Sequence, residues 1–214
     1  MTIAEHAADA AELLGHLGVE RAHVAGHSTG AVIALQLAHD RPGIVQSLAL
    51  LEPPLLGVAS TAAFFEKAGP ALAAYAAGDS ALATSEFLSM VSSLDWKSCQ
   101  AVIEKHIPGG VAQAVAGADN FFESYLPALG AWQFGSDQAA AISQPVLSVL
   151  GRETERLFID SDELLHTWFP RSEECRIEGA AHLLHMLRLK PVVSGVAAFF
   201  ARHPIRVLAG AKAL

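Results

Sequence analysis

The sequence predicts an α/β fold built on a partial, doubly wound and mainly parallel sheet, with a helical segment inserted into it. Short apolar runs with strand character alternate with helix-periodic segments at both ends of the 214-residue chain, a pattern typical of parallel sheets with right-handed crossovers. Between these ends, residues 57–142 show helical periodicity broken by glycine and proline, and no strand is predicted there. We therefore expect one core made from residues 1–56 and 143–214, and a helical insert at 57–142.

The first elements follow directly from the N-terminal residues. Thr2 and Glu5 have the spacing of a capping box, and the apolar stripe behind them runs until Gly18, which predicts a helix. Residues 21–25 form a short apolar run that predicts a buried strand, and residues 31–39 have the spacing of a helix.

The remaining core elements repeat this alternation. The segment VQSLALLEPP (45–54) predicts a second buried strand, which two prolines end because proline lacks the N–H that a sheet ladder needs. A further strand is predicted at 145–151, a helix at 162–168, a strand at 174–179 and a final helix at 191–203.

Composition excludes several classes of protein. Hydrophobic residues make up 52% of the chain and the formal net charge is −8, so there is no electrostatic reason to bind nucleic acid or an anionic membrane. Cys99 and Cys175 lack any metal-binding spacing and favour a reducing compartment. We find no secretory signal and no uninterrupted apolar run of about 18 residues. We therefore expect a cytoplasmic protein that acts on a small molecule.

A glycine-flanked serine stands between a predicted strand and a predicted helix. Gly26-His27-Ser28-Thr29-Gly30 matches the pattern G-x-S-x-G, in which a sharp strand-to-helix turn raises the serine hydroxyl above the sheet as a nucleophile. We expect side chains at positions 26 and 30 to collide across this turn, and the Thr29 N–H to stabilise an oxyanion. The alternative is that Ser28 only caps the helix.

A serine needs a base, and histidine has a suitable pKa. His182 follows the last predicted strand in a loop, so we expect it at the same edge of the parallel sheet as Ser28. His185 is the alternative base. The histidines expected on the surface or in ordinary packing are His23, His27, His39, His166 and His203.

Three segments carry a resemblance to a known family. GHSTG (26–30), SQPVLSVLG (143–151) and IEGAAHLLHM (177–186) resemble the α/β-hydrolase family, near its esterase, haloperoxidase and carbon-carbon hydrolase branch. The resemblance implies a nucleophile elbow at Ser28, a catalytic triad in the order nucleophile, acid and histidine, and a helical lid at 57–142. The sequence shows no glycine-rich phosphate loop and no cluster of metal ligands, so we expect no metal and no cofactor.

The acid of the implied triad departs from the usual pattern. Many members carry an aspartate at the position that Thr154 occupies here, three residues after Gly151. Other members place the acid after the strand that follows the nucleophile helix, which is where Glu52 stands. We therefore assign Glu52 to hold His182 in its useful tautomer. The alternative acids are Glu153, Glu155, Asp160 and Asp162, of which Asp160 has the spacing of a helix cap with Glu163.

A second departure concerns the start of the chain. Family members have several strands before the elbow strand, and a loop among them supplies a second oxyanion N–H. Here one predicted helix precedes the elbow strand, so we expect that strand to form a bare sheet edge. Loss of one oxyanion donor costs about 3 to 4 kcal/mol in the transition state. The alternative function is therefore a truncated or non-catalytic chain whose exposed sheet edge serves homo-oligomeric subunit association.

The helical insert is rich in aromatic residues, which we expect to form mainly its core. An apolar lid above a serine suits a small-to-medium acyl group. We therefore predict a serine hydrolase in which Ser28 attacks an apolar carboxylic ester or related carbonyl and an acyl-enzyme is then hydrolysed. The aromatic residues are Phe64, Phe65, Tyr75, Phe87, Trp96, Phe121, Phe122, Tyr125, Trp132 and Phe134, with Met90 beside them.

Overall fold

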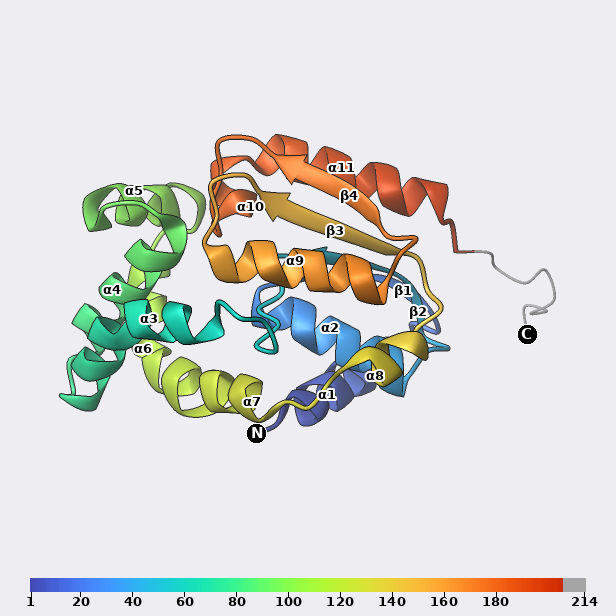
Figure 1. Cartoon of the computed structure of the whole chain (residues 1–214), viewed down its shortest axis with the longest axis horizontal. Coiled ribbons are helices and arrows are strands. Elements are labelled where there is room, and N and C mark those ends of the chain that lie inside the picture. The colour runs from blue at the N-terminus through green and yellow to red at the C-terminus, as the bar shows by residue number, and fades with distance from the viewer. Residues whose placement is uncertain (206–214) are drawn as a thin grey trace.

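The computed structural model describes residues 1–205 and contains one four-stranded sheet in which every strand is parallel (Figure 1). The strands are β1 (Ala22–His27), β2 (Val45–Leu51), β3 (Val146–Gly151) and β4 (Glu173–Ile177), and they lie in the order β1-β2-β3-β4. The prediction of a mainly parallel sheet is confirmed. Since β1 pairs only with β2 among the described residues, one edge of β1 has no strand beside it.

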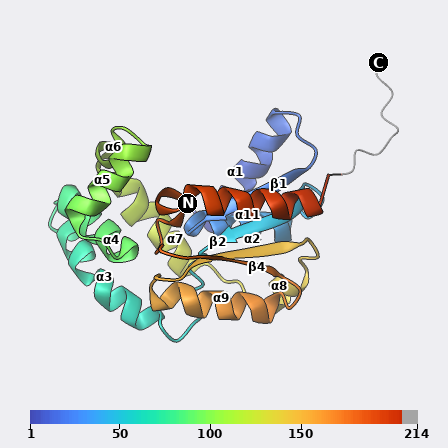
Figure 2. The same ribbon diagram turned by 90° about the horizontal axis from the view of Figure 1, so that it is seen from above.

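Helices cover both faces of the sheet, as in a doubly wound fold (Figure 2). On one face, α2 (Thr29–Asp40) and α9 (Arg156–Trp168) pack on β2 and β3, and α1 (Ile3–His16) packs against α2. On the other face, α11 (Leu189–Arg202) packs against β3 and β4, with Phe199 fully buried. The predicted capping box of Thr2 and Glu5 begins α1.

The chain between β2 and β3 forms helices, with no strand in this described segment. Figure 1 shows α3 to α6 gathered beyond the arrowheads of the strands, which are the carboxyl ends. The helices are α3 (Thr61–Ala76), α4 (Ser80–Ser92), α5 (Trp96–His106), α6 (Gly110–Ala116), the π-helix η1 (Asn120–Tyr125), α7 (Leu126–Ala131) and α8 (Ser136–Ala140). A short helix, α10 (Leu184–Leu187), follows β4.

Two expectations from sequence are wrong in detail. Helix α9 begins at Arg156, six residues before the expected start, so Asp160 lies within the helix and forms an ion pair with Arg156 instead of capping it. Two aromatic residues of the insert, Trp132 and Phe134, pack on the core beside α2 and α9 and not within the helical insert. Their place after α7 explains this, because the chain there already returns toward β3.

Cys99 and Cys175 are both free thiols. Within residues 1–205, every helix is too short or too polar to cross a lipid bilayer.

Candidate active site

Ser28 stands at a sharp corner between β1 and α2. Its backbone has φ 55° and ψ −129°, a conformation that a residue with a side chain adopts only under strain. The Ser28 N–H donates to the carbonyl of Leu51 at 2.9 Å, which ties the corner to the end of β2. The Ser28 side chain makes no capping hydrogen bond to α2, so the interpretation of this serine as a helix cap is wrong.

The two glycines of the corner have different roles. A Cβ at Gly26 would lie 2.3 Å from the carbonyl oxygen of Gly30, so any side chain at position 26 would force the corner open. A Cβ at Gly30 would meet nothing within 4 Å. The expected collision therefore holds for position 26 and is wrong for position 30, since the first turn of α2 points the missing Cβ of Gly30 into open space.

Glu52 lies directly after β2, the strand that pairs with β1, and Ser28 lies directly after β1. Glu52 also has a positive φ, 47°, and the residue is 1% exposed. One carboxylate oxygen accepts the Gly151 N–H at 2.8 Å, and the other accepts the Thr154 hydroxyl at 3.0 Å and His182 Nδ1 at 2.7 Å. A strained corner thus turns a buried carboxylate toward the end of β3.

The ring of His182 is fixed from several sides. Its Nδ1–H donates to Glu52, which leaves Nε2 as the nitrogen available to accept a proton. The Phe158 ring stacks on the imidazole at 4.1 Å between centroids and 13° between planes. His27 Nε2 donates to the His182 carbonyl at 2.8 Å, so the residue beside the serine also holds the backbone of the histidine.

Ser28 and His182 line one small cavity of about 30 Å³. This volume is far below that of typical ligand pockets, about 300 to 1,000 Å³. Apolar side chains from the helical insert close most of the remaining wall: Phe64, Phe65, Phe87, Val91 and Phe121. The cavity beside Ser28 is therefore nearly filled by protein atoms in this conformation.

Burial controls the protonation of the pair. Burial, aided by the nearby His185, lowers the pKa of His182 to about 3, so the imidazole is neutral at pH 7. Burial raises the pKa of Glu52 to about 7, although the hydrogen bonds from Gly151 and Thr154 act in the opposite direction. A neutral imidazole beside an ionised carboxylate is the state that a general base requires, and with a pKa of about 7 the Glu52 carboxyl ionises fully only above neutral pH.

Thr29 is the first residue of α2 and lines the same cavity as Ser28. The first N–H groups of a helix have no partner within that helix, and they lie at the positive end of its dipole. The Thr29 N–H is therefore available to an oxygen that gains negative charge near Ser28.

Two of the alternative acids stand elsewhere. The Glu153 carboxylate accepts the N–H groups of Gly179 and Ala180, at 3.1 and 2.6 Å, and so fixes the loop that leads to His182. Glu155 forms an ion pair with Lys67 of α3 at 2.7 Å. Neither carboxylate is hydrogen-bonded to a histidine.

The aspartates also have partners of their own. Asp162 is buried between the Ser148 hydroxyl and the Arg176 guanidinium, and Asp160 pairs with Arg156. His166 Nε2 lies 3.6 Å from Asp162, too far for a good hydrogen bond.

The alternative base, His185, lies beside the site. Its ring is 4.4 Å from that of His27, and burial lowers its pKa. It does not line the cavity that Ser28 and His182 share. The other histidines pack as expected from sequence, for example His23 against Ser47 and Phe200. His27 is the exception, because it supports His182 directly.

Sequence reasoning missed Phe158 and the role of Thr154. Phe158 gave no signal because a phenylalanine in an apolar helical stripe resembles any core residue. Thr154 occupies the position where the family usually has its acid, and its hydroxyl donates to the acid that replaces it. The sequence signal for this role was a hydroxyl residue at position 154 together with a glutamate directly after β2.

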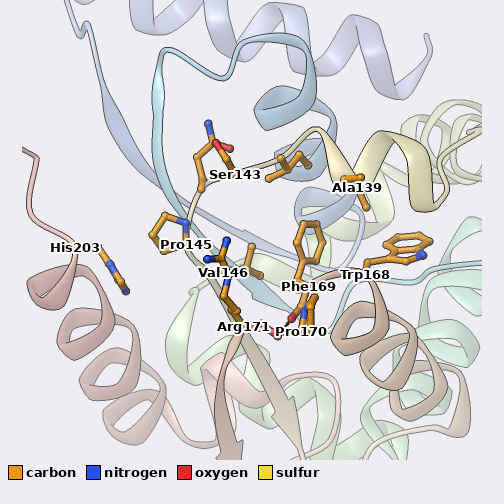
Figure 3. A pocket seen from close by; sticks show the side chains of 13 residues that line it. Ala139, Ser143, Pro145, Val146, Trp168, Phe169, Pro170, Arg171 and His203 are labelled. Carbon is orange, nitrogen blue, oxygen red and sulfur yellow. Dashed lines mark hydrogen bonds between the residues drawn. The ribbon is translucent and has the colours of Figure 1, made fainter.

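A larger cavity of about 450 Å³ lies at the opposite end of the sheet, at the start of β3 (Figure 3). Pro145, Val146, Trp168, Arg171 and His203 are among its lining residues. None of the residues around Ser28 reaches it. Among residues 1–205, no group of three histidine, cysteine or acidic side chains is placed to hold a metal ion.

Comparisons with known proteins agree with this architecture. A family model described as alpha/beta hydrolase fold matches residues 1–189. In sequence, 65 residues are 42% identical to a dihydrolipoyllysine-residue acetyltransferase component of an acetoin cleaving system from Cupriavidus necator, covering 30% of this chain and 17% of that protein.

Solved structures give the same result. The structure of naproxen esterase (carboxylesterase NP) from Bacillus subtilis superposes with a TM-score of 0.67 at 21% identity, covering 93% of this chain and 66% of that one. A thermophilic esterase superposes with a TM-score of 0.74 at 20% identity, covering 96% of this chain and 75% of the other. The chain thus spans about two thirds to three quarters of these two structures. The family model matches most of the chain, including the parallel sheet and the strained serine corner. The protein therefore belongs to the α/β-hydrolase fold family.

Proposed function

We propose that this chain is a serine hydrolase that cleaves a small-to-medium apolar carboxylic ester, or a related carbonyl compound, through an acyl-enzyme. The observation that carries the proposal is the hydrogen bond between Glu52 and His182, whose ring shares a cavity with the strained Ser28. A carboxylate, an imidazole and a serine in this order are the parts of a nucleophilic triad.

The reaction follows from the roles of these groups. His182 Nε2 takes the Ser28 proton while the hydroxyl oxygen attacks the substrate carbonyl, and the Glu52 carboxylate stabilises the imidazolium that forms. The Thr29 N–H stabilises the negative carbonyl oxygen. The imidazolium then protonates the leaving alcohol, and a water molecule activated by His182 releases the acid from Ser28.

The helical insert at residues 57–142 acts as the lid. Its side chains Phe64, Phe87 and Phe121 close the cavity above Ser28, and the backbone of its helix α4 accepts the His182 N–H through the Val91 carbonyl at 3.3 Å. The apolar wall favours an acyl or alkyl group over a sugar or a phosphate. The free thiols of Cys99 and Cys175 suit the reducing cytoplasm that the sequence predicts.

A fluorophosphonate probe tests the proposal, because it labels only an activated serine. We expect the wild-type protein to be labelled, Ser28→Ala to lose the label, and Ser136→Ala, the same change at an exposed serine of α8, to keep it. A well-folded wild-type protein that takes no label at neutral pH would contradict the proposal.

The open edge of β1 supports a second candidate, a non-catalytic chain that associates through this edge. A strand edge without a partner offers N–H and C=O groups to a strand from another subunit. Light scattering at micromolar concentration measures this association. A dimer that takes no fluorophosphonate label favours this candidate, whereas a labelled monomer excludes it.

A further inference from the structure

An apolar cavity inside the helical insert adjoins the cavity of Ser28. It has a volume of about 290 Å³ and lies between α4, α6 and η1. Its wall is mainly aromatic and aliphatic and includes Phe87, Leu88, Ala114, Phe121 and Phe122. Thr84, Asn120 and Tyr125 are its polar lining residues and no charged side chain lines it, so the cavity favours an apolar occupant.

Two phenylalanines separate this cavity from the serine. Phe87 of α4 and Phe121 of η1 are the residues that line both cavities, and their ring centroids are 4.7 Å apart. Both side chains are only partly buried. A change in the rotamers of these two rings would join about 290 Å³ of apolar space to the small cavity above Ser28.

Contacts of Tyr75 anchor η1 through residues other than Phe121, whose ring packs against Phe87 and Phe122. The Tyr75 ring stacks on Phe122 at 4.6 Å, and its hydroxyl lies 2.9 Å from an Asp119 oxygen and 2.8 Å from a Glu123 oxygen, so its one proton can be donated to either carboxylate. These contacts hold η1 on α3 without using Phe121. A π-helix is an uncommon conformation that is frequent at functional sites, and η1 places Phe121 between the two cavities.

Another cavity of about 260 Å³ also touches the serine cavity, through Leu56 and Leu129. Leu129 is buried and packs on Ile3 and Val32, so this wall belongs to the fixed core. Each of the two cavities has one amide side chain in its lining, Gln133 here and Asn120 in the other, so the fixed wall is what distinguishes them. The cavity behind Phe87 and Phe121 is therefore the better continuation of the Ser28 site for an apolar group.

We propose that this cavity is an acyl-chain subsite, in which Phe87 and Phe121 form a gate that opens to admit the unbranched, medium-length acyl chain of an ester whose carbonyl lies on Ser28. The proposal rests on the hydrolase function proposed above for its catalytic part. The gate makes chain length the property that this protein selects, because a short acyl group ends before the gate and a longer one passes through it.

The test fills the cavity and measures chain-length selectivity. We compare kcat/KM for p-nitrophenyl octanoate and p-nitrophenyl butyrate in the wild type, in Ala114→Phe, and in Ala112→Phe, a control on the exposed side of the same helix. Each buried methylene changes a binding constant by roughly fourfold. Loss of the subsite in Ala114→Phe should therefore lower the octanoate-to-butyrate ratio by about tenfold or more, with Ala112→Phe within about twofold of the wild type.

A second variant keeps the proposal falsifiable if Ala114→Phe does not fold. Phe121→Ala removes one half of the gate, so the octanoate-to-butyrate ratio should rise by roughly threefold or more, because the longer chain no longer displaces a ring. A ratio that is unchanged in Phe121→Ala, or equal in Ala114→Phe and Ala112→Phe, would overturn the proposal.

Binding separates this proposal from the hydrolase proposal. If no ester is hydrolysed at any chain length, calorimetry with sodium decanoate still reports on the cavity. Binding to the wild type that weakens about tenfold in Ala114→Phe and not in Ala112→Phe supports the subsite even if Ser28 is inactive. No hydrolysis together with no decanoate binding overturns it.

Discussion

Glu52→Gln is the most direct test of the acid, because it keeps the size of the side chain and changes one oxygen into an amide. The carboxylate accepts three hydrogen bonds, from Gly151, Thr154 and His182. If the amide oxygen stays on Gly151, the NH₂ group faces His182 Nδ1 and forces the proton onto Nε2, which then cannot act as a base. If the oxygen faces His182, the NH₂ group meets the Gly151 N–H, a donor against a donor.

Either orientation is costly at this depth of burial. The wrong tautomer of a triad histidine typically lowers kcat by roughly 1,000- to 10,000-fold. A buried donor without an acceptor lowers the free energy of unfolding by about 1 to 3 kcal/mol. We therefore expect Glu52→Gln to fold with moderately reduced stability and to lose nearly all turnover.

The assay is steady-state hydrolysis of p-nitrophenyl butyrate, with urea unfolding to measure stability. Glu153→Gln is the matched control, since its amide oxygen can still accept one of the two N–H groups that the carboxylate holds. We expect this control to lose less than about tenfold in kcat. Equal losses in the two variants, or the reverse order, would show that Glu52 is not the acid.

Three further predictions follow from the same geometry. Gly26→Ala should lower the free energy of unfolding in urea by about 3 kcal/mol, because its Cβ would lie 2.3 Å from a carbonyl oxygen. Gly30→Ala should instead stabilise α2 by up to about 1 kcal/mol. Equal effects of the two substitutions would contradict the steric argument. The kcat/KM of ester hydrolysis should rise with pH around 7 as Glu52 ionises, and a flat profile would contradict this role. Burial lowers the pKa of His27 and His182 below the ordinary 6.5, so stability should fall as pH drops below this value, by up to about 1.4 kcal/mol per pH unit for each histidine. Between pH 4.5 and 7 the raised pKa of Glu52 acts in the opposite direction and offsets the effect of one histidine. His27→Gln should therefore make the free energy of unfolding in urea depend less steeply on pH. An unchanged dependence would contradict the role given to His27.

Much of the fold could be predicted because its signals are local. The capping box at Thr2, the prolines after β2 and the apolar strands each fix an element within a few residues. The start of α9 was predicted too late because residues 156–161 mix charged and apolar side chains, and tertiary contacts of Leu157 and Phe158 decide their conformation.

The serine corner was predictable because its backbone imposes a pattern, and His182 and Glu52 were predicted because each follows a predicted strand of the parallel sheet. The serine corner needs a small residue at position 26, and this need is visible in the sequence. The support of His182 by Phe158 and His27 was not, because stacking and long-range hydrogen bonds join residues that are far apart in the chain. Ordinary packing residues carry no mark of such a role.

The position of β1 at the end of the sheet has a consequence for how the protein inactivates. Glu52 follows β2, which pairs with β1 and β3, whereas Ser28 follows β1, which pairs with β2 alone among the strands of residues 1–205. Among the described strands, fraying is therefore expected first at the two edge strands, β1 and β4, and amide hydrogen exchange should be faster in β1 than in β2. Mild denaturant would loosen β1 and β4, which precede the serine and its base, while β2 and β3 stay paired, so that catalysis disappears before cooperative melting begins.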